Sequence, residues 1–288
     1  MLLMTGAAVL AAAIPVPAAP AGAARPDAPT GRVPPPAAPP GTTAQGTYLF
    51  HDEFDGPAGS APDPSNWTVA TFRAPIKNPV FWDRPENLGQ YRDDRRNVFV
   101  DGNSNLVLRA TKEGDPDQGA GIAGTYFSGK VQGTWWGGIG TTWEARIKFN
   151  CLTAGCWPAW WLSNDDPAVG SEIDLIEWYG NGDWPSGTTV HANPIGTSFA
   201  THPIEVDSGW HRWRVTWNPA GMYFWQDYVA GAEPYFTVPA NSLKGWPFNF
   251  PDYRVFPVLN LAVGGSGGGD PRPGTYPADM LIDWVRVF

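Results

Sequence analysis

Several stretches of the chain alternate apolar and polar residues with a period of two, the pattern of a half-buried β-strand. Thr142–Phe149 reads TWEARIKF and Trp210–Trp217 reads WHRWRVTW, so each segment places its large apolar side chains on one face. Further strands are predicted at Asn105–Ala110, Met222–Tyr228, Arg254–Val263 and Leu281–Phe288. Clusters of Gly, Pro, Asn and Asp separate these segments, and helical periodicity is almost absent.

Many short strands joined by turns predict an all-β fold, a concanavalin-like β-jelly-roll sandwich of two antiparallel sheets. Such a sandwich can curve one sheet into a concave substrate groove, which suits an extended polymer better than a closed pocket does. Because β-sandwiches of this size often form one domain, we assign a single domain to residues 47–288.

The segments before this domain differ from it in composition. Residues 1–24 carry no charged side chain and run from an apolar stretch, Ala7–Ile14, to the small-residue tail PAGAA. This order resembles a secretory signal peptide with cleavage near Ala23 or Ala24, and the apolar stretch is too short for a membrane span. Residues 25–46 are rich in Pro, Ala, Gly and Thr and predict an extended linker. We therefore expect a secreted or cell-envelope protein.

The charge and the aromatic content of the chain indicate which classes of partner it binds. The net charge is -9 and no basic run is present, which argues against nucleic acid and against an anionic membrane surface. The sixteen Trp residues are more informative. Most should fill the core, and a minority should line the groove, because flat aromatic rings match the C–H faces of sugars. We expect a monomer that binds a β-linked polysaccharide.

Two cysteines, Cys151 and Cys156, lie in the segment CLTAGC. In an exported chain an even pair at short spacing favours a disulfide, and two buried free thiols are the alternative. A metal site is not expected here, because two cysteines with no nearby His cannot complete a tetrahedral shell.

The segment Ser171–Gly180, SEIDLIEWYG, holds three acids, Glu172, Asp174 and Glu177. On a helix the two glutamates would point about 140° apart. On a regular strand an offset of five residues sends them to opposite faces. One inserted residue restores the common face, so we predict a β-bulge between Asp174 and Glu177.

Three acids on one face repel each other and resist joint ionisation. A structural sheet gains nothing from this arrangement, whereas hydrolysis of a glycosidic bond requires one ionised and one protonated carboxyl group. A solvated acidic strand edge is the alternative interpretation. It is disfavoured because β-branched residues flank the acids and aromatic residues surround them.

Further segments accompany EIDLIE along Tyr48–Phe288, in the order HDEFDG, WEARIKF, GCWPAWWL, TVHAN, VLNLAVGG and MLIDWVRVF. Together they resemble the laminarinase-like enzymes of glycoside hydrolase family 16, in particular the actinobacterial, mycobacterial-type β-glucanases. EIDLIE matches the bulged form of that family's acidic motif at every fixed position.

The resemblance implies a retaining endo-glycosidase that cleaves internal β-1,3-glucosidic bonds of a β-glucan with no cofactor for catalysis. Glu172 would be the nucleophile and Glu177 the general acid/base, while Asp174 would share a proton with Glu172. Retention requires the two catalytic carboxyl groups to lie about 5 to 5.5 Å apart.

The resemblance also implies substrate contacts. Trp157 and Trp161 would stack on sugars; strand alternation places them on one face and Trp160 on the other, although one of the pair could instead be core. His191 would hydrogen-bond the aspartate of the acidic motif or the substrate, and a lone His in a strand is often only a satisfied polar group. Asn87, in PENLGQY, would contact a sugar hydroxyl or form a turn.

Many family members hold one structural cation on the convex side of the sandwich. The matching positions are Glu53, Gly102 and Asp283, the first two through backbone carbonyls, and calcium takes oxygen ligands of this kind. A surface acid on an edge strand is the alternative for Asp283. Such a metal would stabilise the fold and take no part in catalysis.

Two departures from the family pattern leave the linkage specificity open. Thr141 and Thr142 stand where an Arg is common, and the loop after VLNLAVGG reads SGGGDPRPG, without the usual Trp. The alternatives are a β-glucan or β-galactan hydrolase of other specificity, a transglycosylase, or a non-catalytic carbohydrate-binding protein. A purely structural envelope protein would leave the acid cluster unexplained.

Overall fold

The structure is a computed structural model that describes residues 48–70, 88–114, 125–164, 170–193 and 195–288. The predicted signal peptide, the predicted linker and Asn87 lie outside these residues. No helix in the described ranges is both long enough and apolar enough to cross a membrane.

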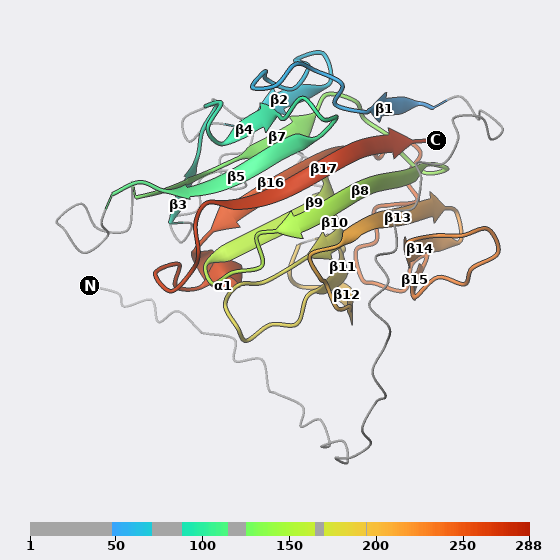
Figure 1. The fold of residues 1–288 in the computed structure, drawn as a ribbon. Helices are drawn as coiled ribbons and strands as arrows, with labels where there is room; N and C mark the ends of the chain where they lie inside the picture. The colour runs from blue at the N-terminus through green and yellow to red at the C-terminus, as the bar shows by residue number, and fades with distance from the viewer. Residues whose placement is uncertain (1–47, 71–87, 115–124, 165–169, 194) are drawn as a thin grey trace, which may run out of the picture. The chain divides into compact units, whose positions relative to one another are not determined.

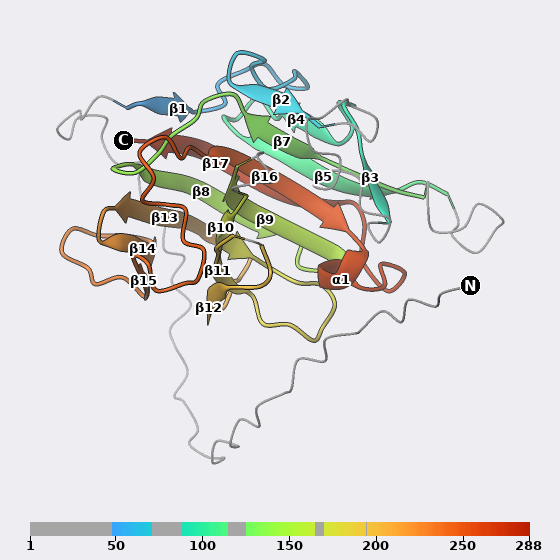
Figure 2. The same ribbon diagram turned by 180° about the vertical axis from the view of Figure 1, so that it is seen from behind.

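Strands dominate the described chain and form two sheets (Figures 1 and 2). The ten-stranded sheet contains β1 (Phe50–Asp52), β3 (Gly89–Tyr91), β4 (Val98–Val100), β5 (Leu106–Lys112), β6 (Tyr126–Ser128), β8 (Thr142–Asn150), β13 (Trp210–Asn218), β14 (Gly221–Gln226), β15 (Phe236–Pro239) and β17 (Ala278–Val287). The seven-stranded sheet contains β2 (Trp67–Val69), β7 (Lys130–Gly133), β9 (Cys156–Ser163), β10 (Glu172–Glu177), β11 (Gly187–His191), β12 (Phe199–Pro203) and β16 (Phe256–Val263). One short helix, α1 (Gly265–Gly268), follows β16.

The order of strands joins segments that are far apart in the sequence. The ten-stranded sheet runs β15-β14-β13-β8-β17-β5-β6-β3, with β1 beside β17 and β4 beside β5, and the seven-stranded sheet runs β12-β11-β10-β9-β16-β7-β2. Among the described strands only β3 and β6 pair in parallel. The prediction of an all-β jelly-roll sandwich of two antiparallel sheets is confirmed.

The alternating segments correspond to strands with one face in the core. In β8 the inward residues Trp143, Ala145, Ile147 and Phe149 are all buried. The strand predicted over Met222–Tyr228 ends earlier, at Gln226, because Asp227 adopts a left-handed conformation with φ 53° that turns the chain. Periodicity therefore identifies the strands, and local backbone conformation decides where they end.

The core between the sheets is rich in tryptophan. Trp160 is 0% exposed and belongs to the same buried cluster as Trp143, Trp213 and Trp217. Because removal of a buried indole leaves a large cavity, we expect Trp160→Ala to lower the free energy of unfolding by about 3–5 kcal/mol. Urea denaturation measures this. The matched control is Trp184→Ala, a residue 49% exposed, for which the change should stay within about 0.5 kcal/mol.

The predicted disulfide is not formed, since Cys151 and Cys156 are both buried and carry free thiols. Burial raises the pKa of both, to about 12 for Cys156, and the neighbouring Cys156 further raises that of Cys151. Because the thiolate is the reactive form of cysteine, both thiols are inert at neutral pH. The structure instead contains two buried free thiols, which was the alternative prediction from the sequence.

Candidate active site

A bulge in β10 brings the three acids of EIDLIE to one face of the seven-stranded sheet. Three steps along β10, from Asp174 to Glu177, match only two steps along β11. Leu175 and Ile176 are consecutive in the chain, yet both are buried in the core between the sheets. This extra inward residue returns Glu177 to the outer face, so the predicted β-bulge is confirmed.

The neighbouring strands extend this acidic face sideways. Asp174 lies opposite Trp161 of β9, and Glu177 lies opposite Ala159. On the other side of β10, His191 of β11 lies opposite Glu172. Since side chains of directly opposed residues point to the same face, the acids, the indole and the imidazole form one continuous patch over three strands.

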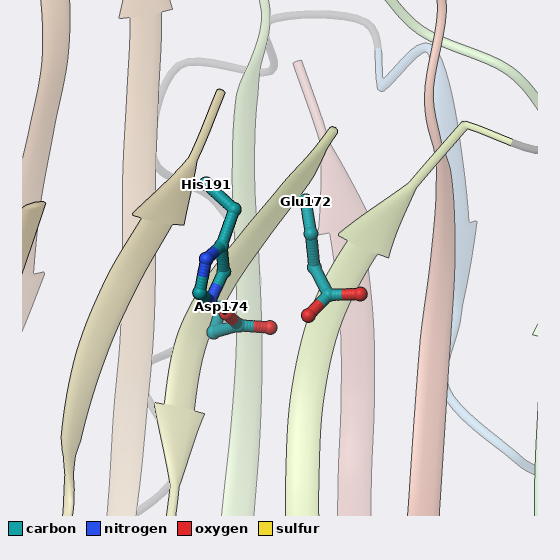
Figure 3. Close-up of side chains that lie close together, drawn as sticks. All are labelled: Glu172, Asp174 and His191. Atoms are coloured by element: carbon teal, nitrogen blue, oxygen red, sulfur yellow. Dashed lines mark ion pairs between the residues drawn. The ribbon is translucent and has the colours of Figure 1, made fainter. Parts of the chain in front are cut away.

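Figure 3 shows the side chains of Glu172, Asp174 and His191 converging from β10 and β11. One ligand-type atom from each lies within 4.8 Å of the others. His191 Nε2 is 3.5 Å from Asp174 Oδ2, which is too long for a hydrogen bond. Burial lowers the pKa of His191 to about 4, so the imidazole is neutral at neutral pH. His191 thus lies beside Asp174 without a hydrogen bond to it, and the alternative, a hydrogen bond to the substrate, stays a prediction.

Asp174 is the most deeply buried of the three acids, with 2% of its surface exposed. Burial raises its pKa well above 3.8, and the negative charges of Glu172 and Glu177, followed by a hydrogen bond with Glu172, raise it further. This shift favours the protonated form of Asp174, which can donate a hydrogen bond to the Glu172 carboxylate. The family resemblance implies that Asp174 shares a proton with Glu172, and this role stays a prediction.

We expect Asp174→Asn to raise the melting temperature at pH 7. A raised pKa means that the folded protein holds this proton more tightly than the unfolded chain does. The wild type therefore loses stability as the pH rises from about 3.8 towards the raised value. Asn cannot ionise, so the variant does not lose this stability. Each kcal/mol of unfolding free energy that it keeps should raise the melting temperature by about 2–4 °C.

Calorimetry between pH 3 and pH 8 measures this difference, which should vanish below the ordinary pKa of Asp. Asp207→Asn is the control, because a backbone hydrogen bond from Gly209 and then one with His211 lower the pKa of Asp207. Its replacement should not raise the melting temperature at pH 7. Equal melting temperatures for Asp174→Asn and wild type across the range would contradict a buried, protonated Asp174.

Glu177 has a different environment from Asp174. Trp157 Nε1 donates to its Oε1 at 2.9 Å, and the Tyr179 hydroxyl donates to its Oε2 at 2.6 Å. Burial raises the pKa of Glu177, and the two donors, Tyr179 first, oppose that rise. The sequence analysis did not single out Tyr179. The sequence did contain a signal for Tyr179, because in a strand a residue two positions after Glu177 lies on the same face as Glu177.

The two tryptophans predicted to contact sugar lie on the outer face, and Trp160 lies in the core, as alternation predicted. Trp161 is only 9% exposed and donates to Asn260 Oδ1 at 2.6 Å. Trp157 is half-buried, and the backbone of Gly267 lies against its ring. Their roles in substrate binding remain predictions.

In the predicted calcium set, the carboxylates of Glu53 and Asp283 each form an ion pair with an arginine. Arg286 binds both carboxylate oxygens of Glu53 at 2.9 and 2.8 Å, and Arg146 binds the Asp283 carboxylate at 2.5 Å. Gly102 lies in the turn between β4 and β5 with φ 81°. Asp283 is the one side-chain ligand of the predicted set, and the guanidinium beside it opposes a cation there. The donor set therefore does not favour calcium, and the site stays a prediction.

A cavity of about 640 Å³ lies on the other sheet, over β4 and β5. Its lining includes Arg96 and Arg109, which form ion pairs with Asp94 and Asp279. None of the three acids of EIDLIE lines it. Because the cavity contains none of these acids, the acidic face of β10 remains the candidate active site.

A jelly-roll sandwich with a bulged acidic strand on the outer face of one sheet defines a class of glycoside hydrolase. The chain belongs to the glycosyl hydrolases family 16, whose family model matches residues 87–286.

Solved structures and curated proteins agree with this membership. The chain is 71% identical to a structure described as an immunostimulatory antigen and pseudo β-1,3-glucanase of Mycobacterium tuberculosis, with TM-score 0.75 over 84% of this chain and 98% of that one. It is 66% identical to a putative β-glucanase of Mycobacterium abscessus, with TM-score 0.76 over 84% and 100%. It is 28% identical to the glucan endo-1,3-β-glucosidase A1 of Niallia circulans over 83% of this chain, but spans only 37% of that protein.

Proposed function

We propose that this protein is a retaining endo-glycosidase that hydrolyses internal β-1,3-glucosidic bonds of a β-glucan. The observation that carries the proposal is the bulge in β10, which sets Glu172 and Glu177 on one face, on either side of Asp174, whose pKa is raised by burial. A retaining glycosidase requires a carboxylate nucleophile beside a carboxylic acid. Family membership and the glucan-active relatives support the substrate class.

In the first step the Glu172 carboxylate attacks the anomeric carbon of the sugar. The bond to the glycosidic oxygen breaks as Glu177 gives that oxygen its proton, and a glycosyl ester of Glu172 forms. Burial, which raises the pKa of Glu177, favours the protonated state that this step needs. The proton that Asp174 donates to Glu172 helps hold the carboxylate in position.

In the second step Glu177, now ionised, takes a proton from water as the water oxygen attacks the same anomeric carbon. The ester bond breaks, Glu172 leaves as a carboxylate, and Glu177 is protonated again. Two displacements at one carbon retain the β configuration of the product. The hydrogen bonds from Trp157 and Tyr179 support the ionised Glu177 of this step.

A glucan-binding protein without hydrolytic activity is a second candidate. The similar structure from Mycobacterium tuberculosis is described as a pseudo β-1,3-glucanase. In the present protein both oxygens of Glu177 already accept hydrogen bonds from the protein itself, and these two bonds oppose the rise in pKa that burial causes.

Product analysis separates the two candidates. The purified protein is incubated with linear β-1,3-glucan, mixed-linkage β-glucan and β-galactan, with and without an acceptor oligosaccharide, and the products are identified by chromatography. Release of β-1,3-linked oligosaccharides from the linear glucan supports an endo-glycosidase. Transfer of sugar to the acceptor indicates a transglycosylase. Binding by calorimetry with no product from any polymer would support the non-catalytic candidate and overturn the proposed one.

A further inference from the structure

The environment of the Glu177 carboxyl group has a feature that the acidic motif alone does not require. Each of its two oxygens accepts one hydrogen bond from a different aromatic side chain, Trp157 from β9 and Tyr179 from the segment after β10. A third aromatic residue, Trp184, packs edge-on against Tyr179 with ring centroids 5.3 Å apart. The carboxyl group is therefore fixed from two sides by groups that are themselves packed.

Backbone pairing fixes the position of Tyr179. The Trp178 amide donates to the Pro158 carbonyl at 3.2 Å, and the Gly180 amide donates to the Cys156 carbonyl at 2.9 Å. The segment thus continues alongside β9 beyond the end of β10. Since alternation continues with it, Tyr179 points to the same face as Glu177 and reaches its Oε2 atom.

The glycine-rich loop after β16 supports the other donor, Trp157. A Cβ atom at Gly267 would come within 2.5 Å of the Trp157 ring, so only glycine lets the loop backbone lie this close. The Asn181 amide donates to the Gly267 carbonyl at 3.1 Å, and the Asn181 side chain donates to the Ser266 carbonyl at 2.8 Å. The SGGG segment therefore packs onto Trp157 from a loop that is tied to the segment carrying Tyr179.

We propose that Tyr179 is a positioning residue that, opposite Trp157, fixes the Glu177 carboxyl group and governs the proton that this group gives and takes. The inference rests on the proposed function for its catalytic meaning. Its physical basis is the short hydrogen bond from a phenol to a carboxylate, which stabilises the ionised form. Burial and the charge of Glu177 raise the pKa of Tyr179, so the phenol remains a donor throughout the working pH range.

Tyr179→Phe keeps the ring and removes only the donor. Without it the ionised Glu177 loses one of its two partners, so the pKa of Glu177 should rise by about one to two pH units. In the pH profile of kcat/KM on a β-1,3-glucan, the basic limb reports the general acid. We expect this limb to move upward by that amount, while the acidic limb and KM stay nearly unchanged.

Tyr223→Phe is the matched control. Tyr223 lies on β14 in the other sheet, stacked on Trp225, and its replacement should leave both limbs in place. A rise in KM with an unmoved pH profile would instead make Tyr179 a sugar contact, and the proposal would be wrong.

A second measurement does not depend on turnover. Carbon-13 NMR of protein labelled at glutamate carboxyl carbons follows the titration of Glu177, whose signal is assigned by its absence in Glu177→Gln. The Glu177 midpoint should be higher in Tyr179→Phe than in wild type. Equal midpoints overturn the inference even if the enzyme is active, and a shifted midpoint supports it even if no glucan is cleaved.

Discussion

Glu172→Gln is expected to lower kcat on β-1,3-glucan by at least about 10⁴-fold, the order of loss that follows removal of an enzyme nucleophile. Glutamine has nearly the same shape as glutamate but cannot form the glycosyl ester. The neighbouring Asp174 could still donate a hydrogen bond to the amide oxygen, so the fold should be preserved. Binding of an oligosaccharide, measured by calorimetry, should change little.

The stereochemistry of chemical rescue identifies the role of Glu172. In Glu172→Ala, azide can enter the space of the missing carboxylate and displace the leaving sugar in a single step. One displacement inverts the anomeric carbon, so the product is an α-glycosyl azide. A β-glycosyl azide from this variant, or turnover of Glu172→Gln within tenfold of wild type, would show that Glu172 is not the nucleophile.

The position of the acids could be predicted from the sequence because it depends on parity. An offset of five between Glu172 and Glu177 cannot place both on one face of a regular strand, and the apolar residues between them supply the extra inward residue. Leu175 and Ile176 are both buried in the structure. The same counting separated Trp160, in the core, from Trp157 on the outer face.

Contacts between residues distant in sequence could not be predicted in this way. Asp283 was a candidate cation ligand, but strand pairing between β8 and β17 brings Arg146 to it. Such a pairing depends on which strands are neighbours, and alternation within one strand does not contain that information. The two cysteines show the same limit, since short spacing permits a disulfide but the packing of the core leaves both thiols free.

The protonation states of the acids also depend on tertiary structure. Three carboxyl groups within one motif have the same chemistry in the unfolded chain. In the fold Asp174 is enclosed and faces two negative charges, whereas Glu177 has a phenol and an indole as donors. The motif therefore identifies the residues. Burial raises the pKa of both acids, and donors from β9 and from the segment after β10 oppose that rise for Glu177 only.

The glycine-rich loop illustrates why a departure from a family pattern can be informative. The absence of Trp in SGGGDPRPG left the specificity open at the sequence level. In the structure Gly267 lies directly against the Trp157 ring, where any larger side chain would collide. The loop therefore restricts one face of Trp157, and the edge of its indole is bound to Glu177. Trp157 is thus tied to the acid/base residue in addition to any contact with sugar.

Glu177→Ala should have a different effect from any change at Glu172, because the acid/base residue is needed only for proton transfer. On β-1,3-glucan, whose leaving group is a poor one, we expect kcat/KM to fall by about 10²–10⁴-fold. A dinitrophenyl β-glycoside of laminaribiose has a leaving group that departs without a proton. Its first step should therefore proceed at nearly the wild-type rate and release one equivalent of dinitrophenol in a burst.

After that burst the Glu177→Ala variant lacks the base that activates water, so the glycosyl ester of Glu172 should accumulate and be visible by mass spectrometry. Azide needs no base and can attack this ester from the side where water would enter. The product is then a β-glycosyl azide, the opposite anomer to that from Glu172→Ala. Glu177→Gln is the control, because its side chain fills the space that azide would enter. It should show the burst but little azide rescue. If Glu177→Ala instead loses activity equally on the polymer and on the activated substrate, Glu177 does not act through its proton, and the hydrogen bonds from Trp157 and Tyr179 then hold a structural carboxylate.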